Sequence, residues 1–212
     1  MKKPLILVGG GGHCKSVIDV AESAGYTILG ILDRPEEVGK SVLNYKIIGS
    51  DDDMTKLAND AEFIVTVGQI QSPELRMRLH KQLDENGCKL ATIIASTARV
   101  SKYSKLGEGT VIMHNAIVNA DARIGKGCII NTFANIEHDV QIEDYCHIST
   151  GAMINGGAFI AEGTFVGSQS VVNQGVRIEI GGIIASGTVV NKNITERGVY
   201  AGNPIKLIHS SL

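Results

Sequence analysis

The sequence IGKGCIINTFANIEHDVQIEDYCHI, residues 124–148, belongs to a run in which an aliphatic residue stands at every sixth position from Val100 to Val190. All sixteen positions hold Val, Ile or Leu, and the residue two places before each is never larger than valine. A period of six fits neither an α-helix nor a heptad. It contains the strand period of two, so each hexad is typical of a short strand followed by a corner. Sustained repetition of this kind predicts a parallel β-helix.

The repeat also gives each residue an expected place in space. Three hexads make one triangular coil of eighteen residues, so residues eighteen apart should be stacked at the spacing of neighbouring strands, roughly 4.8 Å. Cys128 and Cys146 are related in this way and are expected to be small buried apolar residues. The four cysteines show no paired spacing of a zinc site, so no metal is expected.

The N-terminal segment has a different pattern. An apolar run from Lys2 to Val8 leads into four glycines, 9–12, then into His13 and an amphipathic stretch, which predicts a strand, a glycine turn and a helix. Such a turn lets backbone approach a phosphate at the helix N-terminus, which makes the glycine turn a candidate ligand-binding segment.

A second apolar strand, Tyr26–Leu32, ends at Asp33, about twenty residues after the glycines, where a dinucleotide-binding unit holds a ribose hydroxyl. Cys14 stands where that fingerprint has its third glycine, so NAD is not predicted. The alternative interpretation is a glycine turn that only joins strand to helix.

Two domains are predicted. Residues 73–86 have helix character with leucines at 75, 79 and 83, and residues 88–94 form an apolar strand. We expect a small Rossmann-like α/β domain over 1–95 and a β-helix domain with a C-terminal tail over 96–212. The net charge of −2 without a basic block argues against a nucleic-acid partner. No apolar run is long enough for a signal peptide or a membrane span, so we expect a soluble cytoplasmic protein.

Ionisable side chains crowd one part of the repeat, residues 131–150. The hexad pattern points Ile136 and Val140 inward, which leaves His138 and Asp139 outward at a corner. A histidine beside a carboxylate is the usual composition of a general base with its orienting partner. Gly156, eighteen residues after His138, should lie one coil over, leave room for a ligand and offer a backbone N–H to an oxyanion. The alternative is an ordinary solvated polar corner.

His147 stands nine residues after His138, between two inward positions, and so lies on another side of the prism. A site that uses both histidines must then turn a corner or be shared between subunits, as in a cyclic trimer. Otherwise His147 is an ordinary surface residue.

These motifs resemble those of the bacterial hexapeptide acyltransferases that acetylate nucleotide-linked amino sugars or sialic acid, most closely the bacillosamine-pathway N-acetyltransferase type. The matching segments are Gly9–His13, Ile136–Asp139 and Gly202–Pro204, with Lys206 close behind. The resemblance implies left-handed β-helices assembled as homotrimers, with acetyl-CoA in the groove between adjacent helices. The expected reaction is direct acetylation, in a ternary complex, of the 4-amino group of a UDP-linked amino-dideoxy sugar.

The same resemblance implies roles for individual residues. His138 would deprotonate the acceptor and Asp139 would orient it. The remaining roles divide between the two substrates. His147, the Gly156 backbone, Asn131 and Lys206 would serve the acetyl-CoA side, while Gly9, Gly11, Gly12, His13 and Asp33 would hold the nucleotide of the acceptor.

Other functions stay open from the sequence. The acceptor could be a hydroxyl of sialic acid or another sugar. A metalloprotein like the gamma-type carbonic anhydrases would use His114, His138 and His147, although their spacing differs from that family's. A non-catalytic β-helix is the third possibility.

Overall fold

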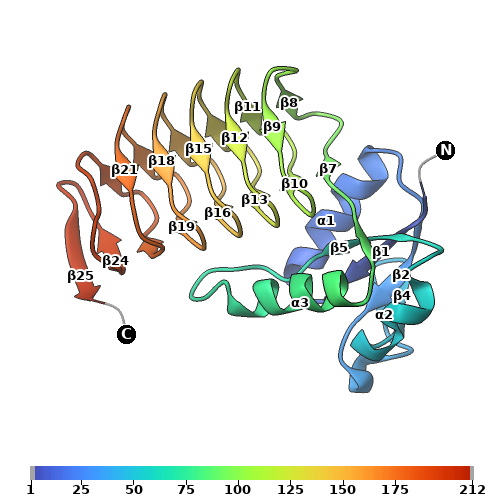
Figure 1. Cartoon of the computed structure of the whole chain (residues 1–212). Helices are drawn as coiled ribbons and strands as arrows, with labels where there is room; N and C mark the ends of the chain where they lie inside the picture. The colour runs from blue at the N-terminus through green and yellow to red at the C-terminus, as the bar shows by residue number, and fades with distance from the viewer. Residues whose placement is uncertain (1–2, 211–212) are drawn as a thin grey trace.

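The computed structural model describes residues 3–210, which form an α/β unit at one end of a left-handed parallel β-helix (Figure 1). The α/β sheet has the strand order β3-β4-β2-β1-β5-β6, and only the β3–β4 pair is antiparallel. The predicted strand, glycine turn and helix are confirmed as β1 and α1. The elements of the unit are β1 (Leu5–Val8), α1 (Gly12–Ser23), β2 (Ile28–Leu32), β3 (Ser41–Val42), β4 (Tyr45–Gly49), α2 (Met54–Leu57), β5 (Glu62–Val65), α3 (Glu74–Glu85) and β6 (Lys89–Leu90), with 3₁₀ turns at Pro35–Glu37 and Asp51–Asp53.

The β-helix has three faces, each a stack of short strands. Face 1 is β7 (Ile93–Ile94), β10 (Val111–Ile112), β13 (Ile129–Ile130), β16 (His147–Ile148), β19 (Phe165–Val166), β22 (Ile183–Ile184), β24 (Gly198–Ala201) and β25 (Lys206–Ser210). Face 2 is β8 (Arg99–Val100), β11 (Ile117–Val118), β14 (Asn135–Ile136), β17 (Met153–Ile154), β20 (Val171–Val172) and β23 (Val189–Val190). Face 3 is β9 (Lys105–Leu106), β12 (Arg123–Ile124), β15 (Gln141–Ile142), β18 (Phe159–Ile160) and β21 (Arg177–Ile178).

The register of the strands is the eighteen-residue one that the repeat predicts. Ile112 pairs with Ile130, and Ile130 pairs with Ile148. The aliphatic track and the track of small residues fill one continuous core, in which Cys128 and Cys146 are fully buried as free thiols. Corners recur every six residues with a backbone in the left-handed region, at about as many non-glycine residues as glycines, and one of the former is Asp139 with φ 60°. Because aspartate tolerates this conformation, the corner that presents His138 can turn without a glycine.

The last coil is shorter than the others. Ile178 bridges to Ile194 and Ile184 pairs with Tyr200, so both partners lie sixteen residues apart instead of eighteen. After it the antiparallel strand β25 pairs with β24 and gives the stack a hairpin at its C-terminal end. The α/β unit packs mainly against the first coils (Figure 1), but its loop 70–74 extends along face 1 and lines a cavity together with the hairpin.

The two parts of the chain share a core. The outward side chains of Ile93, Val111 and Ile129 on face 1 are 0% exposed because they pack with residues of β1 and α1. Residues 88–94, expected to form one strand, are two strands in different sheets, β6 and β7. The chain passes between sheets at residues 91–92, a few residues before the predicted boundary. No helix within residues 3–210 is both long and apolar enough to cross a membrane.

Candidate active site

His138 and Asp139 lie at a corner between face 2 and face 3, at the end of β14. His138 Nδ1 lies 2.7 Å from Asp139 Oδ2, and both side chains are more than half exposed. The hydrogen bond that Asp139 accepts from His138, more than any other cause, raises the pKa of His138. With Nδ1–H donated to the carboxylate, Nε2 is the nitrogen left to accept a proton. This arrangement can act as a general base.

Gly156 lies directly beside the His138 ring, as the spacing of eighteen predicts. A Cβ atom at Gly156 would come within 2.7 Å of His138 Cε1 and 2.8 Å of Nε2. The Gly156 N–H makes no hydrogen bond among the described residues, whereas the next residue, Gly157, donates to the His138 carbonyl. The corner therefore combines an accessible imidazole nitrogen with a free backbone donor.

His147 lies on face 1, away from that corner, and is only 6% exposed. Its Nδ1 lies 2.6 Å from the carbonyl oxygen of Gln69, and its Nε2 lies 3.1 Å from Asn131 Nδ2. Burial is the main cause that lowers the pKa of His147 to about 4. The expectation that its side chain points outward from the coil is correct, but the loop between β5 and α3 covers it. The side chain is therefore a buried neutral imidazole.

His13, at the start of α1, faces the same region. Its ring centroid lies 6.4 Å from that of His147, and its Nε2 is buried without a hydrogen-bond partner among residues 3–210. Burial, followed by the charge of Arg76, lowers the pKa of His13 to about 3. Gly11 caps α1 without a side-chain hydrogen bond, so the first N–H groups of the helix face outward unoccupied by a side chain. Asn131, His13 and His147 thus form one cluster.

The glycine turn borders a pocket of about 250 Å³ at the carboxyl ends of β1 and β5. Gly9, with φ 104°, and Asp33 line it. Asp33 accepts hydrogen bonds from the backbone N–H groups of Gly10 and Arg34, each at 2.7 Å, so part of the carboxylate expected to hold a ribose is used to shape the turn. The sequence did not indicate the remaining lining residues: Val8, Arg34, Asp51, Val67, Leu75, Arg78 and Leu79.

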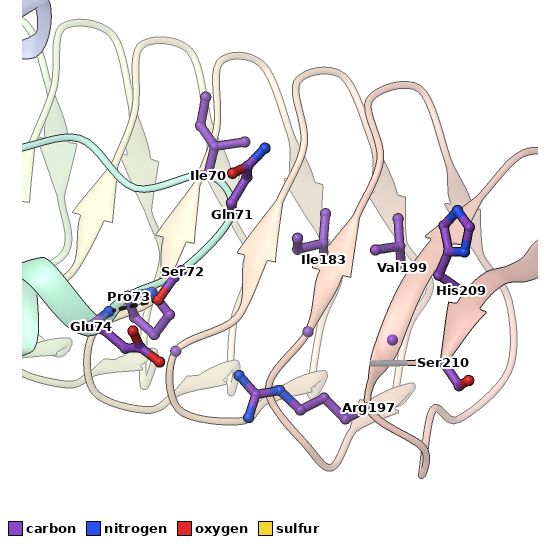
Figure 2. A pocket seen from close by; sticks show the side chains of 13 residues that line it. Ile70, Gln71, Ser72, Pro73, Glu74, Ile183, Arg197, Val199, His209 and Ser210 are labelled. Carbon is purple, nitrogen blue, oxygen red and sulfur yellow. Dashed lines mark hydrogen bonds between the residues drawn. The ribbon is translucent and has the colours of Figure 1, made fainter. Parts of the chain in front are cut away.

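A second, larger cavity of about 330 Å³ runs along face 1 beyond His147. It lies between the loop 70–74 and the strands β22 and β24, and Figure 2 shows Ile70, Ile183 and Val199 along it. Arg197 reaches toward it from the last coil (Figure 2). Lys206 is exposed on β25 and is not among the residues that line this cavity, although His209 and Ser210 of the same strand are.

The structure also separates the three histidines of the metal-site alternative. His114 lies 2.8 Å from the Thr97 hydroxyl and 3.1 Å from Asp19 Oδ2, whereas His147 contacts Gln69 and His138 contacts Asp139. Within residues 3–210 no three His, Cys, Asp or Glu side chains are grouped so that they could hold a metal ion.

Two buried residues of α3 were missed. The leucine spacing predicts a buried stripe of Leu75, Leu79 and Leu83, but Leu75 is 42% exposed, while Arg76 and His80 are each 1% exposed. The signal was present in the sequence, since positions 76, 79, 80 and 83 follow the helix period. Polar residues at two of them concealed it.

Comparisons with known proteins match both parts of the chain. Residues 4–83 match the family model described as the PglD N-terminal domain. Residues 103–136 and 121–156 match the model described as the bacterial transferase hexapeptide, six repeats. A search of curated proteins found no match.

Several solved structures share the complete architecture. The acetyltransferase domain of PglB from Neisseria gonorrhoeae, solved with acetyl coenzyme A, is 29% identical, with a TM-score of 0.91 over 98% of this chain and 100% of that one. PerB from Caulobacter crescentus, solved with CoA and GDP-perosamine, is 28% identical, with a TM-score of 0.80 over 97% of each chain. WeeI from Acinetobacter baumannii, 20% identical with a TM-score of 0.87 over 97% of this chain and 99% of that one, supports the fold.

Proposed function

We propose a function for this chain from its membership of the hexapeptide-repeat sugar acetyltransferases. On that premise, it transfers the acetyl group of acetyl-CoA to the 4-amino group of a nucleotide-linked amino sugar. The observation that carries the proposal is the His138 corner, where an imidazole oriented by Asp139 lies against the free N–H of Gly156. The bound molecules of two similar structures support it, since one holds acetyl coenzyme A and the other CoA with GDP-perosamine.

The proposed chemistry needs no covalent enzyme intermediate. The amine nitrogen attacks the thioester carbonyl carbon while His138 Nε2 removes its proton, and Asp139 stabilises the imidazolium. The Gly156 N–H donates to the oxyanion of the tetrahedral intermediate. When the carbon–sulfur bond breaks, the imidazolium returns the proton to the CoA sulfur. The products are the sugar amide and free CoA thiol.

The two cavities fit the two substrates. The cavity along face 1 has apolar walls at Ile183 and Val199 and a cation, Arg197, at its rim, which suits the pantetheine chain and phosphates of CoA. The pocket at the glycine turn lies at the carboxyl ends of parallel strands and has the cations Arg34 and Arg78 in its wall, which suits a nucleoside diphosphate, although Gly11, Gly12 and His13 do not line it. Uridine is our first choice of nucleoside.

The test of this function uses purified full-length protein, acetyl-CoA and a panel of UDP-, GDP-, dTDP- and CMP-linked sugars, with and without a free amine. Release of CoA thiol with one amino sugar, together with an acetylated product by mass spectrometry, is the expected result. Turnover only with a hydroxyl acceptor, or with none of the panel, would contradict it.

The four free, buried cysteines are in keeping with the reducing cytoplasm, where we place the reaction.

The separation of His138 from His13 and His147 supports a site shared between subunits. His138 lies at the corner of faces 2 and 3, whereas His147 lies on face 1. The assembly that we propose is a cyclic trimer of parallel prisms in which face 2 of one subunit packs against face 1 of the next, because this pairing brings the two halves together. Two outward residues of face 2 are apolar and exposed, Ile117 at 38% and Met153 at 43%.

Ile117→Glu is therefore expected to dissociate the trimer and to abolish acetyl transfer, because it places a charge in the apolar contact and separates the half-sites. Light scattering after size-exclusion chromatography measures the mass, and CoA release measures activity. The matched control is Arg123→Glu, an exposed position on face 3 of the same coil, which should leave both unchanged. A wild type that is monomeric and active would contradict the shared site.

A further inference from the structure

Arg76 is a fully buried cation at the joint between α3 and the β-helix. Its Nη1 donates to the carbonyl oxygens of Val65 at 3.0 Å and Val67 at 2.5 Å, and its Nη2 donates to Gly127 at 2.9 Å. Among the described residues no carboxylate lies close enough to form an ion pair with it. A buried charge without an anion is costly, and apolar residues would join two domains more favourably. The presence of a buried guanidinium here therefore points to a role beyond holding the two domains together.

Two of the three carbonyl groups that Arg76 holds lie at the last residue of β5, Val65, and in the segment that follows it, at Val67. Two residues after Val67, Gln69 is 3% exposed and is fixed to the β-helix at both ends. Its carbonyl oxygen lies 2.6 Å from His147 Nδ1, and its side-chain amide donates to the Gly163 carbonyl at 3.2 Å. Arg76 thus anchors the start of the loop whose end contacts His147.

The hydrogen bonds of His147 fix the orientation of the Asn131 side-chain amide. A carbonyl oxygen only accepts, so His147 Nδ1 carries the proton and Nε2 is the acceptor. Asn131 Nδ2 donates to that Nε2 at 3.1 Å, while Asn131 Oδ1 accepts from the Thr132 N–H at 2.7 Å. The amide oxygen and one amide N–H of Asn131 therefore both have partners. These two contacts also fix the direction of the second Nδ2–H.

We infer that Arg76 is a positioning residue of the proposed active site, which acts through the chain Val67, Gln69, His147 and Asn131 to aim the Asn131 amide. The inference rests on the proposed acetyl transfer. It also means that the domain that binds the acceptor orients a group on face 1 of the β-helix. Burial is the main cause that lowers the pKa values of His13 and His147, and the charge of Arg76 adds to that effect on both imidazoles.

The first test needs no variant. Proteins labelled with ¹⁵N in histidine report the tautomer of each ring, and the expected state of His147 is neutral with the proton on Nδ1 from pH 8 to pH 5. Assignment uses the spectrum of His147→Gln. A His147 ring that carries its proton on Nε2, or that is protonated at pH 6, would overturn the inference. This readout does not depend on turnover, so it separates a failure here from a failure of the proposed function.

The second test compares Arg76→Met, Arg76→Lys and the control Lys81→Met, which removes an exposed charge from the same helix. Arg76→Met is expected to lower kcat by about 10- to 100-fold, the cost of a small misplacement of reacting groups. Binding of acetyl-CoA, measured by calorimetry, should change far less, and the pKa of His147 should rise. Arg76→Lys keeps the charge and one donor group, so it should recover part of kcat.

A purely structural role predicts a different result. The melting temperature and the folded fraction would fall, but kcat per folded molecule and the His147 signal would stay at their wild-type values, and that outcome would overturn the inference. If neither Arg76 variant folds, the tautomer of His147 in the wild type decides.

Discussion

His138→Ala is expected to lower kcat by about 10²- to 10⁴-fold, the usual contribution of a positioned general base, while acetyl-CoA still binds. Among residues 3–210 the exposed imidazole is hydrogen-bonded only to Asp139, and the coil beneath it is fixed by the Ile136 and Ile154 pairing, so alanine removes the base without disturbing the core. CoA release under saturating substrates measures kcat, and calorimetry measures acetyl-CoA binding. A fully active His138→Ala enzyme would refute the assignment.

The pH profile distinguishes a base from a residue that only binds substrate. Because Asp139 raises the pKa of His138, the imidazole loses its proton at higher pH than a free histidine does. In Asp139→Asn the pKa of His138 should fall, so the acid limb of kcat/KM should move to lower pH, while the maximum rate drops less than in His138→Ala. An acid limb that stays in place would argue that another group titrates.

The Gly156→Ala variant tests whether the position of the His138 ring matters, because it displaces the imidazole without removing it. The added methyl group would overlap the His138 ring, at 2.7 Å from Cε1, although the backbone there needs no left-handed conformation. The base remains chemically intact but is displaced. We expect a fall in kcat that approaches that of His138→Ala, with the unfolding free energy little changed.

The sequence alone allowed a close prediction of the β-helix because the same constraint repeats in every hexad. One aliphatic and one small residue per strand must both point inward, so the positions of Ile130, Ile148 and Cys146 follow from counting. The same counting places Gly156 against His138, since residues eighteen apart occupy the same position in neighbouring coils. It also shows that no loop interrupts the coils to select an acceptor.

The contacts between the two domains could not be predicted in this way. The repeat states that His147 points out of face 1, but not that the loop carrying Gln69 covers it, because the period contains no information on which face the α/β unit packs against. The buried positions Arg76 and His80 do follow the helix period together with Leu79 and Leu83, but the polar character of their side chains makes them poor candidates for burial. Asp33 was placed correctly at the end of β2, but its hydrogen bond to the Gly10 N–H depends on turn geometry that composition does not specify.

The buried histidines make a strong prediction about acid stability. Burial, as the main cause, lowers the pKa of His13 and His80 to about 3 and that of His147 to about 4, against a usual value of 6.5. The unfolded chain therefore binds protons that the folded chain does not. Their contribution to stability is complete above about pH 7 and is lost as pH falls through 6.5 toward about 4 for His147 and about 3 for His13 and His80.

Each histidine that binds a proton in the unfolded chain but not in the folded chain changes the unfolding free energy by about 1.4 kcal/mol per pH unit. Three of them give a slope of up to roughly 4 kcal/mol per pH unit near pH 5, before carboxylates contribute. Urea unfolding at pH 8, 7, 6 and 5, at one protein concentration, measures this slope. A stability that is flat between pH 7 and pH 5 would contradict the buried neutral state.

His80→Leu isolates one of these protons. The ring of His80 is packed against Tyr145, with centroids 5.4 Å apart, and neither ring nitrogen has a hydrogen-bond partner among the described residues. The nearby charges of Arg76 and Lys126 both oppose its protonation. Leucine has a similar volume and needs no partner, so stability at pH 8 should change by less than about 1.5 kcal/mol. The acid slope should fall by about one third, because one of three protons no longer binds on unfolding. If the slope of His80→Leu equals that of the wild type, His80 is protonated in the folded protein or its joint with the β-helix opens before the chain unfolds.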